Sequence, residues 1–248
     1  DLRPGLNVAN DLVLSNRPFV YVFTLLVKAA SDSSLQATHH AVIDGASVNL
    51  DAGNRKYTFY FFRTLGSDST VRDGAIAASL DSGFFNKGTR ISIDFQSYCE
   101  DARQVSGSDS IVCKGLLNGQ VLYDNVITGA EILKDTVRKI LFDAEYKIAV
   151  DVDVMAQGAI QTAISFGGNS RGTSSLGYSF TSEITRDLTV YELCPWIVDG
   201  IMAFSVPAAE INTGTIEFMA KSLCNDKMDF DFAGNIYHMR INGKYLKY

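Results

Sequence analysis

Two pairs of aspartates, each separated by one residue, are the first candidates for chemistry in this chain. Asp151 and Asp153 form one pair, and Asp229 and Asp231 form the other. In a β-strand, residues i and i+2 point to the same face, so each pair can bring two carboxylates together. Paired carboxylates can hold Ca²⁺ or Mg²⁺, or can act as a general acid and base. They are also typical of the solvated face of a strand, and neither pair has an EF-hand loop around it. We therefore expect no metal site and no catalytic site here.

Histidines offer a second candidate for a metal cluster. His39 and His40 are adjacent and are followed by Asp44, whereas His238 is far away in the sequence. Neighbouring residues of a strand point to opposite faces, so both histidines cannot easily reach one ion. We expect these histidines to be exposed or to lie in loops.

The sequence motifs of common enzymes are absent. There is no G-x-S-x-G, no H-E-x-x-H and no P-loop, and the FGGNSRG stretch lacks the strand-then-helix context of a phosphate-binding loop. Glu145 and Glu217 could serve a glycosidase, but only their expected positions on strands favour that role. The sequence therefore predicts that the protein is not an enzyme and holds no cofactor.

Composition and charge exclude further classes. The chain has 248 residues, of which 46% are hydrophobic and 20% charged, and this is an ordinary globular composition. Its net charge is −6 and no cluster of Lys or Arg stands out, which argues against sequence-specific binding of nucleic acid. The longest apolar run, FVYVFTLLV at 19–27, is far shorter than the ~20 residues of a membrane span. We expect no membrane insertion and interpret this run as a buried strand.

The four cysteines fit no metal-binding template. Cys99, Cys113, Cys194 and Cys224 form no C-x-x-C pair and match no zinc spacing. Two disulfides or four buried thiols agree with the sequence. We favour thiols, because a chain of this length does not need disulfides to stabilise its core.

Alternation of apolar and polar residues predicts a mainly β protein. It is clear at 90–98, 145–155 and 159–166. Asn118-Gly119 and Asn242-Gly243 favour two-residue hairpin turns, and GGNSRGTSS at 167–175 is expected to be a loop. The fold class that follows is an antiparallel β-sandwich or barrel.

One amphipathic helix is predicted at about 129–142. Thr128 and Glu131 have the spacing of a capping box, and the apolar residues from Ile132 to Leu141 fall on one helical face. We expect 1–248 to be a single β-rich domain. A weak internal duplication could relate 10–83 to 187–245 around a central insert at 88–185.

A strand that is aromatic on both faces is the clearest candidate for an interface. In RKYTFYFFRT, at 55–64, the side chains of Tyr57, Phe59 and Phe61 point one way, and those of Tyr60 and Phe62 point the other. One face should join the core, and a second sheet, the helix or a neighbouring subunit should cover the other. The C-terminal tyrosines are further interface candidates, namely Tyr237, Tyr245 and Tyr248.

These features favour a structural subunit of a homo-oligomeric assembly. The kinds we expect are a virion protein of capsid or tail-tube type and a filament subunit. Its partners would be copies of itself and neighbouring structural proteins, in a virion or extracellular assembly that can form in the cytoplasm. One alternative is a secreted, lectin-like carbohydrate-binding β-sandwich. The second is a β-sandwich hydrolase that uses Asp and Glu carboxylates.

Overall fold

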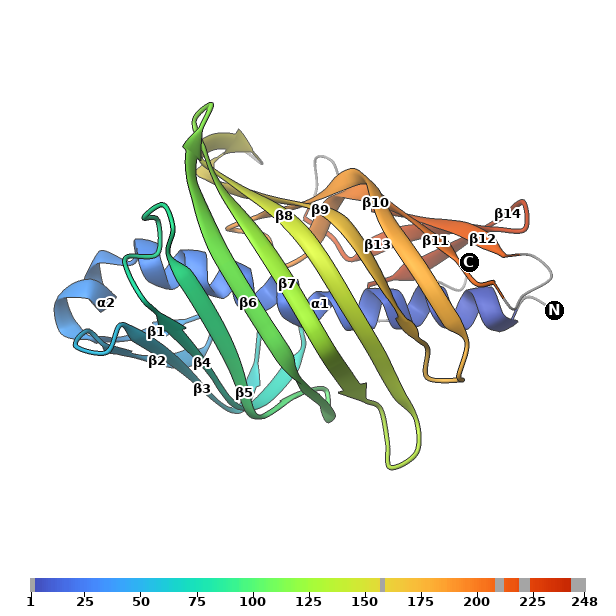
Figure 1. Ribbon diagram of the computed structural model, residues 1–248, viewed down its shortest axis with the longest axis horizontal. Helices are drawn as coiled ribbons and strands as arrows, with labels where there is room; N and C mark the ends of the chain where they lie inside the picture. The colour runs from blue at the N-terminus through green and yellow to red at the C-terminus, as the bar shows by residue number, and fades with distance from the viewer. Residues whose placement is uncertain (1–2, 157–158, 208–211, 219–223, 242–248) are drawn as a thin grey trace.

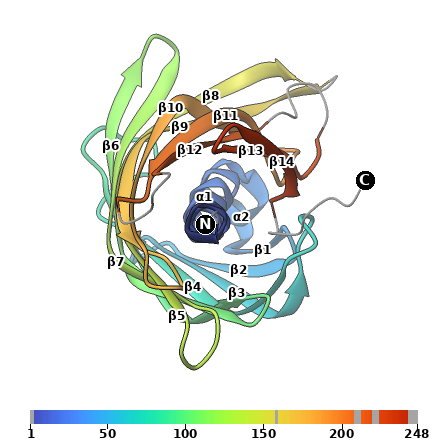
Figure 2. The ribbon, with the colours of Figure 1, turned by 90° about the vertical axis from the view of Figure 1, so that its right-hand side faces the viewer.

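A long N-terminal helix runs through the molecule, and one antiparallel sheet curls around it (Figures 1 and 2). This computed structural model describes residues 3–156, 159–207, 212–218 and 224–241. The central helix is α1 (Arg3–Ser31), and the short helix α2 (Ser33–Thr38) follows it directly. Residues of α1 and of the strands form one hydrophobic core.

The sheet is a meander, because every strand pairs with its neighbours in the chain. All of these pairs are antiparallel, and in the described residues the 14 strands follow one another in sequence order. Among the described strands, β1 and β14 each have one neighbour, so the sheet that they end is open. The mainly antiparallel β class is thereby confirmed. The strands are β1 (His40–Ile43), β2 (Ala46–Asp51), β3 (Lys56–Leu65), β4 (Val71–Leu80), β5 (Arg90–Glu100), β6 (Arg103–Leu117), β7 (Gln120–Leu133), β8 (Lys139–Ala156), β9 (Ala159–Thr173), β10 (Ser179–Tyr191), β11 (Ile197–Ser205), β12 (Thr213–Phe218), β13 (Lys227–Phe232) and β14 (Asn235–Arg240).

The central helix occupies the segment that we expected to contain a buried strand. Residues 19–27 belong to α1, so that prediction was wrong. A helix that is covered on all sides needs no polar face and therefore shows little amphipathic period in its sequence. By length and composition, Pro4–Ser31 could also cross a membrane, but 89% of its apolar window is buried inside this fold. The absence of membrane insertion stays a prediction.

Polar side chains fix the position of α1 inside the sheet. Asp11 accepts hydrogen bonds from Nζ of Lys134 at 3.0 Å and from the backbone N–H of Ser175 at 2.6 Å. The Tyr146 hydroxyl donates to the Asn16 side chain, which is also buried. A buried polar group without a partner costs about 1–3 kcal/mol. Rotation or sliding of the helix would break these bonds, so they set its register.

The helix predicted at 129–142 does not form. β7 ends at Leu133 and β8 begins at Lys139, and a turn joins them. Asp135 shapes this turn because its carboxylate accepts the backbone N–H groups of Val137 and Arg138, at 3.0 and 2.7 Å. The residues of the expected helical face belong to two strands of a hairpin. The turn separates their apolar residues by a spacing that happens to match the 3.6-residue period of a helix.

Other local predictions can be compared directly with the strands. The alternation predicted at 145–155 is confirmed as far as Val150, since Tyr146, Ile148 and Val150 are buried. It was wrong beyond that point, because Val152 is 52% exposed. Asn118-Gly119 makes the β6–β7 turn, with φ of 51° and 85°. Asn242-Gly243 lies outside the described residues.

The loop expected at 167–175 is instead the second half of β9 as far as Thr173. Its glycines have a structural purpose. A Cβ on Gly172 would lie 2.0 Å from the carbonyl oxygen of Leu141, so glycine is what allows β9 to approach β8 this closely. The proposed internal duplication stays a prediction.

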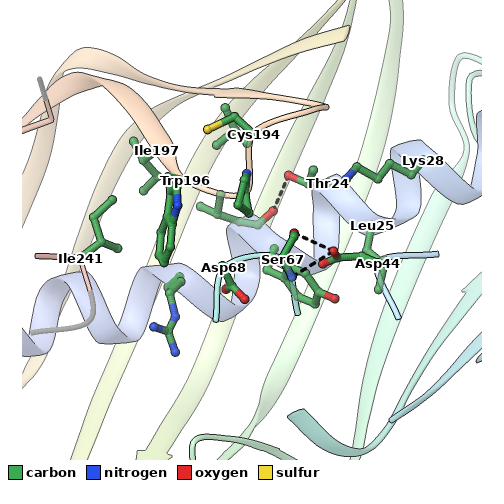
Figure 3. Close-up of a pocket in the computed structure, with 15 residues that line it drawn as sticks. Thr24, Leu25, Lys28, Asp44, Ser67, Asp68, Cys194, Trp196, Ile197 and Ile241 are labelled. Carbon is green, nitrogen blue, oxygen red and sulfur yellow. Dashed lines mark hydrogen bonds between the residues drawn. The ribbon is translucent and has the colours of Figure 1, made fainter. Parts of the chain in front are cut away.

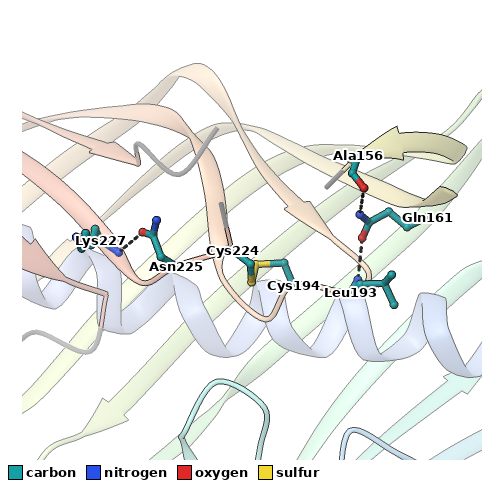
Figure 4. Close-up of a disulfide and its surroundings, with 7 residues drawn as sticks. All are labelled: Ala156, Gln161, Leu193, Cys194, Cys224, Asn225 and Lys227. Atoms are coloured by element: carbon teal, nitrogen blue, oxygen red, sulfur yellow. Dashed lines mark hydrogen bonds between the residues drawn. A yellow bond between two sulfur atoms is a disulfide. The ribbon is translucent and has the colours of Figure 1, made fainter. Parts of the chain in front are cut away.

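One disulfide is present, contrary to our preference for four thiols. Cys194 and Cys224 are bridged across 30 residues, whereas Cys99 and Cys113 are free (Figure 4). The turn after β10 is also held from the side, because the N–H of Leu193 donates to Gln161 at 3.0 Å. The disulfide thus fastens Cys224, which precedes β13, to the turn between β10 and β11.

Candidate functional site

The aromatic strand is β3, and its two faces have different surroundings. Tyr57, Phe59 and Phe61 point into the core and are buried. Tyr60 and Phe62 point outward, with 39% and 78% of their surface exposed, and no second sheet or helix among the described residues covers them. Their rings are stacked, with centroids 6.5 Å apart. Whether a neighbouring subunit covers this face stays a prediction.

A β-bulge holds Phe62 away from the core. The register between β3 and β4 shifts between Phe61 and Thr64, and Arg63 takes a φ of 50°. Side chains replace the interrupted ladder bonds: the N–H of Phe62 donates to Oγ1 of Thr64 at 3.1 Å, and that of Arg63 donates to Oδ1 of Asp73 at 3.3 Å. Bulges re-aim side chains and end strand pairing, and this one keeps an aromatic ring in solvent.

The exposed surface continues to the edge of the sheet. Tyr60 pairs with Ser47 on β2, and Ser47 pairs with Val42 on β1, so these residues form one row. Val42 is 75% exposed. We call Val42, Tyr60 and Phe62 the outer aromatic patch. Its last strand, β1, pairs with β2 alone in the part of the chain that the structure describes.

The C-terminal candidates do not add to this patch in the described residues. Tyr237 is half-buried and packs on the Phe230 ring, with centroids 5.7 Å apart, as part of the core. Tyr245 and Tyr248 lie outside the described residues.

The carboxylate pairs lie on strands but in separate surroundings. Asp153 has a φ of 60° at a shift in the β8–β9 register, so the alternation that would align it with Asp151 is interrupted. Asp229 contacts Nδ1 of His238 at 2.6 Å across the β13–β14 pair, while Asp231 is exposed. No group of three His, Cys, Asp or Glu side chains suited to a metal ion occurs among the described residues.

The remaining catalytic candidates are also apart. Glu145 is on β8 and Glu217 on β12, with three strands between them in the sheet. Glycosidases hold their two carboxyl groups about 5–10 Å apart, whereas four strand spacings along a sheet amount to about 19 Å. Glu217 is instead bonded to Arg186 at 3.0 Å. His39 ends α2 and His40 begins β1, and both are exposed.

A groove of about 850 Å³ lies across β9 to β13. Its volume suits a small ligand. The aromatic residues that line it are Phe204 and Phe232, which are buried, and no Tyr or Trp is among its lining residues. The exposed stacking rings that a lectin-like site would need are therefore missing from this groove.

A buried network of charges is the feature that the sequence analysis missed. Arg72 is fully buried, and its guanidinium donates to both carboxylate oxygens of Asp68, at 2.8 and 2.6 Å. Nε of Arg72 also donates to Glu100 at 3.2 Å and to the hydroxyl of Tyr98 at 3.1 Å. Arg17 of α1 binds the second oxygen of Glu100 at 3.1 and 2.9 Å, which links the helix to the network.

A second bulge, in β5, turns the side chains of Tyr98 and Glu100 toward the core. Ser97 has a φ of 52°, and from there the even-numbered residues Tyr98 and Glu100 of β5 face the core. Gly74 lies opposite with a φ of 91°, and a Cβ there would be 2.3 Å from the carbonyl oxygen of Ser97. Glycine is therefore required at position 74 for the bulge to fit.

The pKa shifts in the network keep each side chain in its ordinary charge state, as in a cluster that stabilises the fold. Burial alone would raise the pKa of Asp68, but the hydrogen bonds and charge of Arg72 outweigh it and hold that pKa below its usual value. Burial lowers the pKa of Arg17, and the Glu100 carboxylate more than offsets this. Burial raises the pKa of Tyr98 well above its usual value, so its hydroxyl stays protonated. Each charge has a partner, and the network leaves no activated base or nucleophile.

Comparison of the chain with known protein families, with curated proteins and with solved structures found no match.

Proposed function

We propose that the protein is a structural subunit of a homo-oligomeric assembly and that it associates through the outer aromatic patch. A virion protein of capsid or tail-tube type and a filament subunit are the two kinds of assembly we favour. The observation that carries the proposal is the exposed stacked pair of Tyr60 and Phe62, with exposed Val42 two strands away in the row of Tyr60. Exposed apolar side chains gathered on one face of a sheet are typical of a contact between proteins.

The free edges of the sheet support the same proposal. Within the described chain, β1 has no partner beyond β2, and its outward Val42 lies in the row of Tyr60. An unpaired edge strand offers N–H and C=O groups to a strand of another chain. Pairing of two copies at this edge would continue the sheet across the interface, and contact over the outward faces of β1 and β3 would bury the outer aromatic patch.

The size of the expected effect follows from the exposure of Phe62. Complete burial of a phenylalanine side chain contributes about 1.5–3 kcal/mol, and Phe62 has most of its surface to bury. Its replacement by serine should therefore weaken association about 10- to 150-fold. Val126 is a matched control, because it is also an apolar outward residue and is 46% exposed, but on β7.

Sedimentation velocity on the wild type, Phe62→Ser and Val126→Ser over a concentration series tests this proposal. We expect the wild type and Val126→Ser to self-associate alike and Phe62→Ser to remain monomeric at much higher concentration. A wild type that stays monomeric at about 100 μM, a concentration corresponding to only about 5.5 kcal/mol of binding, would contradict it. Equal association of wild type and Phe62→Ser would exclude the patch. Electron micrographs of the associated species would show whether it is a filament or a closed particle.

A further inference from the structure

The two halves of α1 are held inside the sheet in different ways. The second half borders a cavity of about 30 Å³, whose lining includes Thr24, Asp44 and Trp196 (Figure 3). This volume holds about two or three water molecules, so the cavity is too small to be a ligand site. The first half instead carries polar side chains that contact two turns of the sheet directly.

Four polar residues meet at these turns, and we call them the Asp11 cluster. Asn7 and Asp11 lie one helical turn apart on α1. Lys134 belongs to the turn between β7 and β8, and Ser175 belongs to the turn between β9 and β10. Asp11 is fully buried, and only 20% of the Lys134 side chain is exposed. The cluster therefore brings an amine, an amide and a carboxylate together away from bulk water.

The carboxylate of Asp11 lies between the amine and the amide. Its Oδ1 accepts a hydrogen bond from Nζ of Lys134 at 3.0 Å, and its Oδ2 accepts one from Nδ2 of Asn7 at 3.3 Å. Both nitrogens also donate to Oγ of Ser175, at 3.4 Å from Lys134 and 3.2 Å from Asn7. Lys134 and Asn7 thus share two hydrogen-bond partners, which hold their nitrogen atoms close to each other.

This arrangement has the parts that a bond between lysine and asparagine requires. A neutral amine can attack an amide carbon once the two atoms approach to about 3–3.5 Å. A carboxylate that contacts both groups can carry the protons. Among the described residues, Oδ1 of Asn7 has no hydrogen-bond partner, so a rotation of the amide can turn Cγ toward Nζ. The flexible stem of Lys134 allows Nζ to close the remaining distance.

We propose that Nζ of Lys134 and Cγ of Asn7 form an amide bond that cross-links the β7–β8 turn to the central helix. Asp11 first takes a proton from the Lys134 ammonium, which leaves a neutral amine. Nζ then attacks Cγ, and the bond between Cγ and Nδ2 breaks. In all, two protons leave Nζ, and Asp11 carries them to the departing nitrogen. An ammonium and a primary amide thereby become a secondary amide and a free ammonium ion, so atoms and charge balance.

Burial of the cluster favours this reaction. An ion pair held away from water is costly, and transfer of a proton from Lys134 to Asp11 removes both charges. A site with little water also protects the reacting groups from hydrolysis. The product ties α1 to the sheet covalently and closes a ring that takes in about half of the chain. The cross-link is independent of the outer aromatic patch, and either proposal can fail without the other.

The intact mass of the full chain tests the cross-link. After reduction of the disulfide between Cys194 and Cys224, the wild type should be about 17 Da lighter than its sequence, because one ammonia is lost. Digestion with trypsin should then release a branched peptide in which Asn7 and Lys134 are joined. A wild type that has the full mass of its sequence would overturn the proposal.

Lys134→Arg distinguishes the cross-link from other losses of ammonia, such as cyclisation of an asparagine at Asn118-Gly119. Arginine keeps the positive charge but stays protonated and cannot attack, so this variant should have the full mass of its sequence. Lys139→Arg is the matched control, because it changes an exposed lysine that follows the same turn, and it should keep the loss. A loss of about 17 Da that persists in Lys134→Arg would overturn the cross-link.

Asp11→Asn tests the role of the carboxylate. Asparagine keeps the shape of the side chain but cannot take a proton from Lys134, so the variant should also have the full mass of its sequence. A loss of about 17 Da in Asp11→Asn would overturn the assignment of Asp11 as the proton carrier. If neither variant folds, the branched peptide of the wild type decides the test, since its presence shows the bond and its absence excludes it.

Discussion

Replacement of Arg72 by methionine tests whether the buried charge network stabilises the fold. The change removes two hydrogen bonds to Asp68, one to Glu100 and one to the hydroxyl of Tyr98, and it leaves Asp68 buried without its cation. Breaking a buried ion pair from one side costs about 3–5 kcal/mol. This is a large part of the 5–15 kcal/mol by which a typical domain is stable. We expect Arg72→Met to lose about 3–5 kcal/mol of unfolding free energy at pH 7.

The pH dependence separates the loss of the ion pair from a simple packing defect. In the wild type, the pKa of Asp68 in the folded state lies below its unfolded value of about 3.9. The pair therefore contributes stability above about pH 4, and this stability is lost as the pH falls through the folded pKa. In Arg72→Met, burial without a cation raises the pKa of Asp68, so the variant loses stability as the pH rises. The difference between the two proteins should therefore grow from pH 4 to pH 7.

Urea denaturation at both pH values measures these free energies. Arg72→Met combined with Asp68→Leu should recover at least about 2 kcal/mol relative to Arg72→Met alone, because removal of both charges leaves no unpaired ion. Lys139→Met is the control. It breaks the exposed pair with Glu131 and should cost at most about 1 kcal/mol. A loss below about 1 kcal/mol for Arg72→Met, or a loss that is equal at pH 4 and pH 7, would refute the argument.

Two further predictions concern single buried positions. Burial raises the pKa of Asp109 to about 7, so stability that is complete below its unfolded pKa of about 3.9 is lost as the pH rises toward 7. Asp109→Asn keeps an acceptor for the Asn125 amide. In urea denaturation, this variant should be more stable than the wild type by about 2–4 kcal/mol at pH 8 and little changed at pH 4. Equal stability of the two proteins at pH 8 would contradict this. A Cβ on Gly5 would lie 2.2 Å from the Phe232 ring, so Gly5→Ala should lose about 1–3 kcal/mol in the same assay even though alanine favours a helix by about 1 kcal/mol. Phe232→Leu should partly restore the Gly5→Ala variant, and a stabilised Gly5→Ala would show that the ring can move aside.

The predictions from sequence succeeded where one strand face meets water. Ile91 and Ile93 of β5 alternate with exposed Ser92 and Asp94, and a period of two reads directly as a half-buried strand. The pattern of apolar and polar residues did not predict α1. The sheet surrounds this helix, so no side of it faces water and its sequence has no polar face that would show a helical period. The prediction from pattern failed again at the turn between β7 and β8, where a window of 14 residues spanned two strands and mixed their patterns.

The outer aromatic patch and the buried charge network could not be predicted in full, because they depend on a bulge and on contacts between residues far apart in the sequence. The outward position of Phe62 was predicted from alternation, but the bulge at Arg63 that keeps it exposed was not. Arg17 and Arg72 are 55 positions apart in the chain and meet at Glu100 only because α1 lies inside the sheet. Polar residues inside an otherwise apolar helix, such as Asp11 and Arg17, were the available signal for such contacts.

The meander around a central helix has a consequence for how the chain is made. Each strand pairs with the one before it, so hairpins can close as they leave the ribosome. The helix is made first, yet its bonds reach Tyr146 and Ser175, at separations of 130 and 168 residues. At about 5–20 residues per second, these partners arrive on the order of ten seconds later. The most deeply buried segment of the finished protein is thus its most exposed apolar segment during synthesis, when shielding by a chaperone matters most.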